Sequence, residues 1–331
     1  MRTKNIATVF AIVAAALYAI NIPLSKILLE YISPTMLAAF LYLGAGVGLL
    51  IYSGISKAIG KIPKAEPLTK KELPYTIAMI VLDIIAPILL MFGIRISAAA
   101  NVSLINNFEI VATSIIALAI FKEIISRKLW IAISLVTVAS IILTFEGAGT
   151  FDFNVGSLFV LGASLCWGFE NNCTKMMSSK SSTEIVVLKG VFSGLGSLIV
   201  ALIMGESFPA LTYVLFALLL GFVAYGLSIK LYILAQKDLG AAKTSAYYSM
   251  APFLGVTFSM LLLQEKPNIQ FYVALVIMLI STYFMIKDSI QLQHTHEHSH
   301  GNIIHTHTHV HTNCDDIEQH NHEHKNANNP S

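Results

Sequence analysis

"FAIVAAALYAINIPLSK" (Phe10–Lys26) and "FVLGASLCWGFENNCTK" (Phe159–Lys175) are two versions of one pattern, 149 residues apart. Each begins with phenylalanine and has an aromatic residue eight positions later, then a small residue, a hydroxyl residue and a final lysine. A second match, at a shift of 142 residues, relates "AANVS" (Ala99–Ser103) to "AAKTS" (Ala241–Ser245). At that same shift Glu123 meets Glu265. The chain is therefore predicted to consist of two copies of one unit.

The composition places both copies in a membrane. Hydrophobic residues make up 55% of the 331 residues, charged residues only 12%, and the mean hydropathy is +0.70. A soluble domain carries about a quarter charged residues, so this chain has too few to cover a water-facing surface. Its apolar residues stand in runs of about 20, the length that crosses a hydrocarbon core about 30 Å thick. We predict an all-α polytopic protein with ten transmembrane helices, over residues 5–27, 34–53, 74–93, 98–120, 129–145, 156–176, 185–204, 211–232, 240–263 and 269–286.

The first apolar run follows Arg2 and Lys4 and could be taken for a secretory leader. Because a close copy of it stands in the middle of the chain, we interpret it as a retained helix. The three cysteines, Cys166, Cys173 and Cys314, are scattered and imply no disulfide framework.

Each unit contains five predicted helices, and an odd number places the second copy upside down relative to the first. We predict one unit over residues 1–147, a second over 148–288 and a separate tail over 289–331. Inverted halves are a recurring plan of secondary transporters, which hold their substrate between the halves near the bilayer midplane. The alternative is a duplicated membrane scaffold without transport.

The two openings resemble those of EamA-type carriers of the drug/metabolite transporter superfamily, over about residues 5–287. The resemblance extends to "FEIVATSIIALAIFKE" (Phe108–Glu123) and "MAPFLGVTFSMLLLQE" (Met250–Glu265). It implies a 5+5 inverted repeat and the transport of amino acids, small metabolites or drugs. The family often has Glu-Pro in this helix and Gly-Glu about a dozen residues later. Here the first half has Glu109-Ile110, the second has Ala251-Pro252, and Lys122 and Gln264 replace the glycines, so no substrate is carried over.

The basic residues predict the orientation. With the N-terminus in the cytoplasm, the outer side holds only Lys26, Arg95 and Lys266 of the 21 lysines and arginines, which leaves 18 inside. Both termini, and therefore the tail, are predicted to be cytoplasmic in a multi-pass protein of the plasma membrane.

Three carboxylates, Asp83, Glu109 and Glu170, fall inside predicted spans. An acidic residue at a helix centre costs about 2.5–3.5 kcal/mol, so each is expected to face a partner or a water-filled cavity. Helical spacing places Ser103 and Asn106 on the face of Glu109, and Ser245 and Tyr248 on the matching face of the second half. We interpret these faces as opposite walls of a central cavity.

The opening helices contribute similar faces, with Tyr18 and Asn21 in the first and Trp167 and Asn171 beside Glu170 in the second. Pro23 removes a backbone donor at the same turn, which frees a carbonyl. No histidine or arginine lies at depth, so the cavity is predicted to be acidic and to favour a cationic or zwitterionic cargo. The alternative for the intramembrane asparagines is bonding between helices, worth about 0.6 kcal/mol each. Gly44, Gly48, Gly190 and Gly194 are read as close-packing positions of the small-xxx-small type.

All 11 histidines lie in the tail, which is polar and predicted to be disordered. "HTHEHSH" and "HTHTHVH" space imidazoles two residues apart, and imidazole is a common ligand of zinc, copper, cobalt and nickel. The predicted metal-ligating residues are His294, His296, His298, His300, His305, His307, His309 and His311.

We therefore predict a secondary carrier of a small polar or amphipathic metabolite such as an amino acid, with no required cofactor. It is expected to act as a monomer or homodimer, coupled to protons or metal ions, and without nucleic acid. The alternative is a carrier of nickel, cobalt or zinc whose tail buffers or senses the metal. No phosphate loop or nucleophile–base motif indicates an enzyme.

Overall fold

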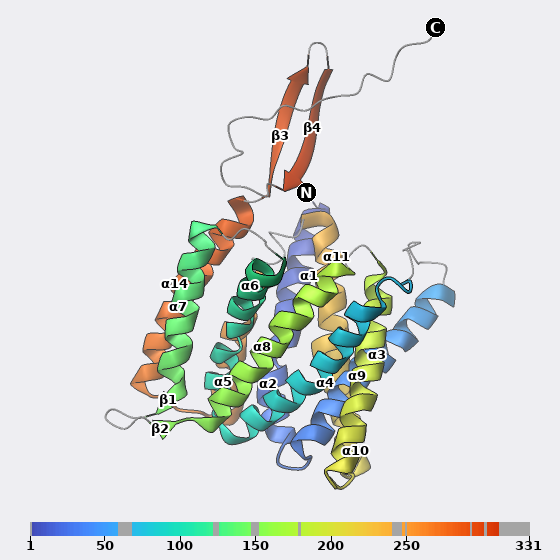
Figure 1. Ribbon diagram of the computed structural model, residues 1–331, viewed down its shortest axis with the longest axis vertical. Helices are drawn as coiled ribbons and strands as arrows, with labels where there is room; N and C mark the ends of the chain where they lie inside the picture. The colour runs from blue at the N-terminus through green and yellow to red at the C-terminus, as the bar shows by residue number, and fades with distance from the viewer. Residues whose placement is uncertain are drawn as a thin grey trace.

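The computed structural model describes residues 2–58, 68–121, 126–146, 152–177, 180–239, 247–248, 250–291, 293–300 and 303–310. These residues form a bundle of helices with two short strand pairs (Figure 1). The first half of the bundle, from the unit predicted over residues 1–147, contains α1 (Arg2–Ala19), α2 (Asn21–Leu28), α3 (Pro34–Ala58), α4 (Leu73–Ile96), α5 (Ala99–Ile105), α6 (Phe108–Phe121) and α7 (Arg127–Thr144). The second contains α8 (Val155–Met176), α9 (Ser182–Ile203), α10 (Leu211–Gly221), the π-helix η1 (Phe222–Leu227), α11 (Ser228–Leu239), α13 (Ala251–Leu263) and α14 (Ile269–Gln291).

Seven helical segments of the described residues are long and apolar enough to cross a membrane: 6–28, 34–56, 73–96, 99–120, 127–144, 183–203 and 211–232. Each coincides with a predicted span. The other three predicted spans contain α8, α13 and α14. Of these, α8 has 22 residues and a length of about 33 Å, enough to span, but it carries Glu170, Asn171, Asn172 and Lys175. Two of these polar residues, Glu170 and Asn171, line a cavity between the halves of the bundle.

Three predicted spans are interrupted rather than continuous. The first breaks at Ile20, between α1 and α2, because Pro23 has no N–H for the carbonyl of Ala19. The fourth breaks at Asn106 and Asn107, between α5 and α6, and the eighth contains η1. Irregular backbone at membrane depth is tolerated where it lines a cavity or is covered by protein.

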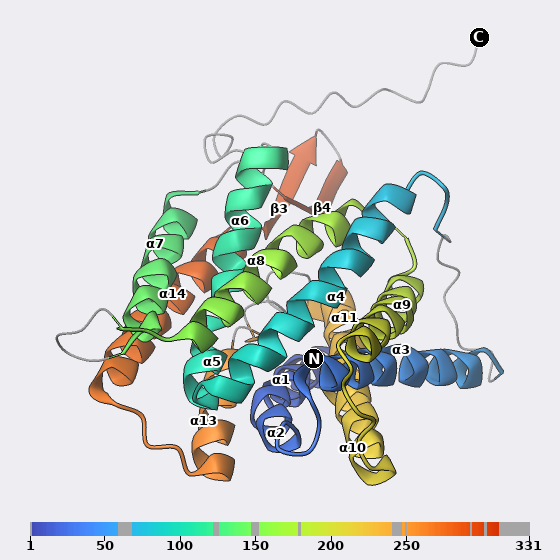
Figure 2. The ribbon, with the colours of Figure 1, turned by 60° about the horizontal axis from the view of Figure 1, so that its bottom comes forward.

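Equivalent helices of the two halves make equivalent contacts. The long contacts are α3 on α9, α7 on α14, α4 on α8 and α1 on α11 (Figure 2). The first two pairs each join a helix to its equivalent in the other half. In the last two pairs, α1 is the equivalent of α8 and α11 lies in the equivalent of α4, so these two contacts also correspond. Figure 1 shows α1 beginning at one end of the bundle and α8 beginning at the opposite end.

Small residues allow the closest of these contacts. A Cβ on Gly190 of α9 would lie 2.5 Å from the Cα of Gly46 in α3 and 2.9 Å from the carbonyl oxygen of Tyr42. A Cβ on Gly44 would collide with the backbone of Leu218 in α10. The prediction that Gly44 and Gly190 are packing positions is confirmed.

Two charged residues hold the corner between α4 and α5. The Lys26 ammonium donates to the carbonyls of Ile94, Arg95 and Ser97 at 2.6, 2.9 and 2.8 Å, where α4 ends. The Glu265 carboxylate accepts from the backbone N–H groups of Ala99 and Ala100 at 2.7 and 2.8 Å, where α5 begins. Each charge has the sign that the adjacent helix dipole favours.

We expect Glu265→Ala to lower the free energy of unfolding by about 1.5–3 kcal/mol, because two backbone donors lose a charged acceptor. Glu265→Gln should retain part of this, since its one carbonyl oxygen still accepts. Thermal unfolding of the detergent-purified variants measures both, with Glu30→Ala, at an exposed turn, as the control. Equal stability of Glu265→Ala and Glu30→Ala would contradict the capping role.

Two strand pairs accompany the helices of the predicted all-α bundle. β1 (Phe145–Glu146) pairs with β2 (Asp152–Phe153), and β3 (Gln293–His300) pairs antiparallel with β4 (Ile303–Val310). The second pair lies where the sequence predicted disorder. Its residues alternate histidine with threonine, serine or glutamate, and that two-residue period with β-branched residues is compatible with a strand. Figure 1 places this hairpin at the end of the bundle where α1 begins.

Candidate functional site

A cavity of about 340 Å³ lies between the two halves of the bundle. Both halves contribute to its wall. Its lining residues are Tyr18, Tyr42, Ala45, Asn106, Asn107, Glu109, Ile110, Trp167, Glu170, Asn171, Val186, Lys189, Gly190, Tyr225, Ile229, Tyr248, Ala251 and Pro252. The volume falls in the range of small-ligand sites, about 300–1,000 Å³.

The interrupted helices meet at this cavity. Asn106 and Asn107 form the break between α5 and α6, and Tyr225 lies within η1. π-Helical turns are often found at functional sites. Discontinuous helices at the substrate site are a recurring feature of transporters, because a break leaves backbone and side-chain polar groups free to face the cavity.

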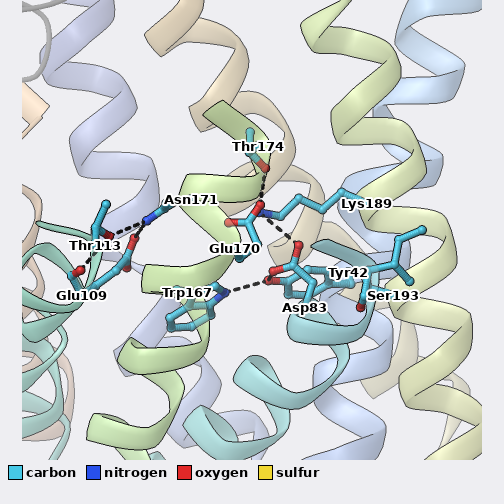
Figure 3. Close-up of polar contacts among 11 residues, drawn as sticks. Tyr42, Asp83, Glu109, Thr113, Trp167, Glu170, Asn171, Thr174, Lys189 and Ser193 are labelled. Carbon is cyan, nitrogen blue, oxygen red and sulfur yellow. Dashed lines mark hydrogen bonds and ion pairs between the residues drawn. The ribbon is translucent and has the colours of Figure 1, made fainter. Parts of the chain in front are cut away.

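A buried ion network forms one side of the site (Figure 3). The Lys189 ammonium lies 3.0 Å from an oxygen of Glu170 and 3.2 Å from an oxygen of Asp83, so one cation from α9 joins carboxylates from α8 and α4. Tyr42 donates its hydroxyl to Asp83 at 3.0 Å and accepts from the Trp167 indole at 3.3 Å. Asp83 is fully buried, and the Lys189 side chain is only 20% exposed. Such groups cost several kcal/mol to desolvate and depend on one another.

Glu109 forms a second cluster, on the other side of α8 in Figure 3. One of its oxygens accepts from the Asn171 side-chain amide at 2.7 Å, and the same amide donates to the Thr113 hydroxyl at 3.2 Å. Glu109 lies in the first turn of α6, directly after the helix break. This carboxylate therefore has a neutral hydrogen-bond partner, whereas Glu170 has a cationic one.

Most of the predicted substrate-binding residues lie on the cavity wall: Tyr18, Asn106, Glu109, Trp167, Glu170, Asn171 and Tyr248. Three others lie behind it. Asn21 donates to the Tyr225 hydroxyl at 2.8 Å, Asp83 binds Lys189 and Tyr42, and Ser103 donates to the carbonyl of Ala99 within its own helix. Ser245 lies outside the described residues.

Lys189 is one of the 18 basic residues that were predicted to be cytoplasmic, and the cavity was predicted to be acidic without it. It lies within α9, about two turns from the start, and faces Glu170 instead of the membrane surface. Its signal was a lone lysine inside an otherwise apolar run. Tyr42 and Tyr225 were missed because nothing in their spacing separates them from lipid-facing aromatic residues.

The predicted metal ligands lie away from this cavity. His294, His296, His298 and His300 belong to β3, and His305, His307 and His309 belong to β4. The register pairs His294 with His309, His296 with His307 and His298 with His305. His311 lies outside the described residues.

Comparison with known proteins is consistent with this architecture. The sequence model of the EamA-like transporter family matches residues 5–145 and 154–287. The chain is 26% identical over 290 residues to an uncharacterized transporter of Methanothermobacter thermautotrophicus, an alignment that covers 83% of this chain and 84% of that one. A crystal structure at 15% identity aligns with 86% of this chain and 97% of its own, with a TM-score of 0.62, which shows the fold alone.

Proposed function

Because the chain belongs to the EamA-like transporter family, we propose that it is a secondary carrier of a small polar or amphipathic metabolite such as an amino acid. The observation that carries the proposal is a cavity enclosed between the two matched segments, with a mostly apolar wall that includes a few charged and polar side chains. Tyr18, Asn106 and Glu109 come from the first segment, and Glu170 and Lys189 come from the second. A site shared in this way can open to either side when the halves change their relative position.

The exchange symmetry of the packing supports alternating access. The contact of α6 with α8 corresponds to that of α13 with α1, and the contact of α3 with α10 corresponds to that of α9 with α4. Two halves with equivalent contacts can exchange conformations at little cost in free energy. We propose the plasma membrane as the location, with both termini in the cytoplasm. The positive-inside excess supports this orientation, and so does the common end of α1 and the β3–β4 hairpin.

Transport by the purified protein in liposomes tests the proposal. Vesicles preloaded with a mixed pool of amino acids, amines, organic acids and sugars should exchange at least one of these classes with labelled external compound, and protein-free vesicles should not. We expect Glu170→Gln to reduce the exchange rate at least tenfold, because the substitution removes a cavity carboxylate and one partner of Lys189. Absence of exchange for every class, by protein shown to be folded, would refute the carrier function.

A transition-metal carrier is the second candidate. The β3–β4 register favours it, because it sets three pairs of histidines directly across from each other at the backbone. Among the residues whose side chains the structure describes, no group of three or more histidine, cysteine or acidic residues is placed to hold a metal. The proposed role of nickel, zinc, cobalt or copper therefore concerns the tail.

Growth of a deletion strain separates the two candidates. If metal is the cargo, full-length protein should restore tolerance to toxic nickel, cobalt or zinc, and protein ending at Lys287 should not. If a metabolite is the cargo, both forms should behave alike toward metals and should alter resistance to toxic analogues of that metabolite.

Histidine ligation also predicts that metal binding by the tail fades below about pH 6, as protons compete for imidazole.

A further inference from the structure

We propose that the cargo carries a protonated amino group, and that this ammonium binds between Asn106, Glu109 and the tyrosines Tyr18, Tyr225 and Tyr248. The inference rests on the proposed carrier function and specifies the chemistry of its cavity.

The charges of the cavity favour a cation. Lys189 is the lysine or arginine that lines it among the described residues, and its ammonium is already held by Glu170 and Asp83 at 3.0 and 3.2 Å. Among the described residues, Glu109 has a neutral amide partner, from Asn171, and no ion pair with a lysine or arginine. In the described part of the wall, the Glu109 carboxylate is therefore not paired with a cation. The ammonium of Lys189, by contrast, is paired with carboxylates.

Asn106 supplies an independent observation. Its side chain is only 8% exposed and lines the cavity, and its amide oxygen has no hydrogen-bond partner among the described residues. A buried acceptor of this kind is rare and requires a donor. Asn106 lies three residues before Glu109, across the helix break, so both acceptors lie on the same short stretch of chain. An ammonium N–H group can donate to both, whereas a carboxylate cannot.

Aromatic rings complete the subsite. The ring centroid of Tyr18 lies 5.9 Å from that of Tyr225, edge to face, and 5.9 Å from that of Tyr248. The Tyr225 hydroxyl accepts from Asn21, and the Tyr248 hydroxyl bonds with the Ser228 hydroxyl. Each of these two hydroxyls already has one protein partner, and the rings add faces and edges to the subsite. Ring faces attract cations, and groups of aromatic residues that bind alkylammonium ions use this attraction.

The same geometry sets an order of preference. An amino acid can place its amino group in this subsite, but its carboxylate finds Lys189 already neutralised. An amine of the same skeleton has no such group to accommodate. We expect tyramine to bind at least tenfold more tightly than tyrosine, and 3-(4-hydroxyphenyl)propionate, which lacks the amino group, to bind weakest.

The experiment uses the full-length protein and these three compounds. Thermal shift of the detergent-purified protein measures binding, and exchange in liposomes measures transport. Glu109→Gln keeps the size of the side chain and an oxygen that can accept from Asn171, so it should unfold near the wild-type temperature. We expect it to lose at least tenfold in affinity for tyramine and to leave the weak binding of the propionate unchanged. Asn106→Leu should weaken tyramine binding as well, and Glu30→Gln, at an exposed carboxylate, should change nothing.

The outcomes separate two failures. If the carrier exchanges organic acids or sugars but no amine, or if Glu109→Gln binds tyramine as tightly as wild type, the ammonium subsite is refuted and the carrier function stands. If no compound of the broad pool is exchanged, the proposed carrier function fails as well.

Discussion

Lys189→Met is expected to abolish transport and to lower the free energy of unfolding by about 3–5 kcal/mol. Methionine keeps an unbranched apolar stem one atom shorter than lysine and leaves Asp83 and Glu170 buried without their shared cation. Removing one member of a buried ion network is strongly destabilising, because the remaining charges stay desolvated and uncompensated. Thermal unfolding in detergent and exchange in liposomes measure the two effects.

Two controls sharpen this prediction. Lys266→Met removes an exposed lysine from the loop between α13 and α14 and should leave stability unchanged. The triple variant Lys189→Met, Asp83→Asn, Glu170→Gln removes the charges together and should recover most of the lost stability without recovering transport. A Lys189→Met protein as stable as Lys266→Met would show that the network contributes little.

Gly190→Leu should separate α3 from α9, with a loss of at least about 1–3 kcal/mol in the free energy of unfolding and of most transport. Its side chain would meet the backbone of Gly46 and the carbonyl of Tyr42, which are not flexible side-chain ends and cannot rotate away. Gly190 also follows Lys189 directly and lines the cavity, so displacing α9 displaces the ion network. Unfolding temperature and exchange rate are again the measurements.

Gly54→Leu is the matched control, since Gly54 lies in α3 as Gly46 does but has no atom near a Cβ at its position. It should be neutral or gain up to about 1 kcal/mol, because leucine has a better helix propensity than glycine. Similar losses at Gly54 and Gly190 would mean that glycine is needed for the backbone of these helices and not for their contact.

The sequence predicted the helical positions well, because each long apolar run has little alternative to a helix in lipid. The candidate site was reached in part for the same reason. Glu109, Glu170 and Asn106 stand out in apolar surroundings, and polar residues at depth are expensive without a purpose. Lys189 also stands in an apolar run. Because the positive-inside rule expects lysines near the ends of spans, it was counted as a cytoplasmic charge and not as a cavity residue.

Other features depend on how the helices rotate and pack, which a single sequence does not record. Tyr42 and Tyr225 reach the cavity from helices rich in outward-facing aromatic and aliphatic residues. The break at Asn106 and Asn107 has no proline or glycine to mark it, although Pro23 did mark the break in the first span. Lys26 and Glu265 bind backbone groups of the corner between α4 and α5, which lies far from both residues in the sequence.

That corner decides which helices move together. Glu265 belongs to the second matched segment, yet it holds the first two amides of α5, which belongs to the first. Any rotation of one half against the other must detach the carboxylate from both amides or carry α5 along with the second half. In the latter case Asn106 and Asn107 become the hinge on which α5 swings relative to α6. The mechanical boundary of the carrier would then run through the cavity wall instead of following the duplication in its sequence.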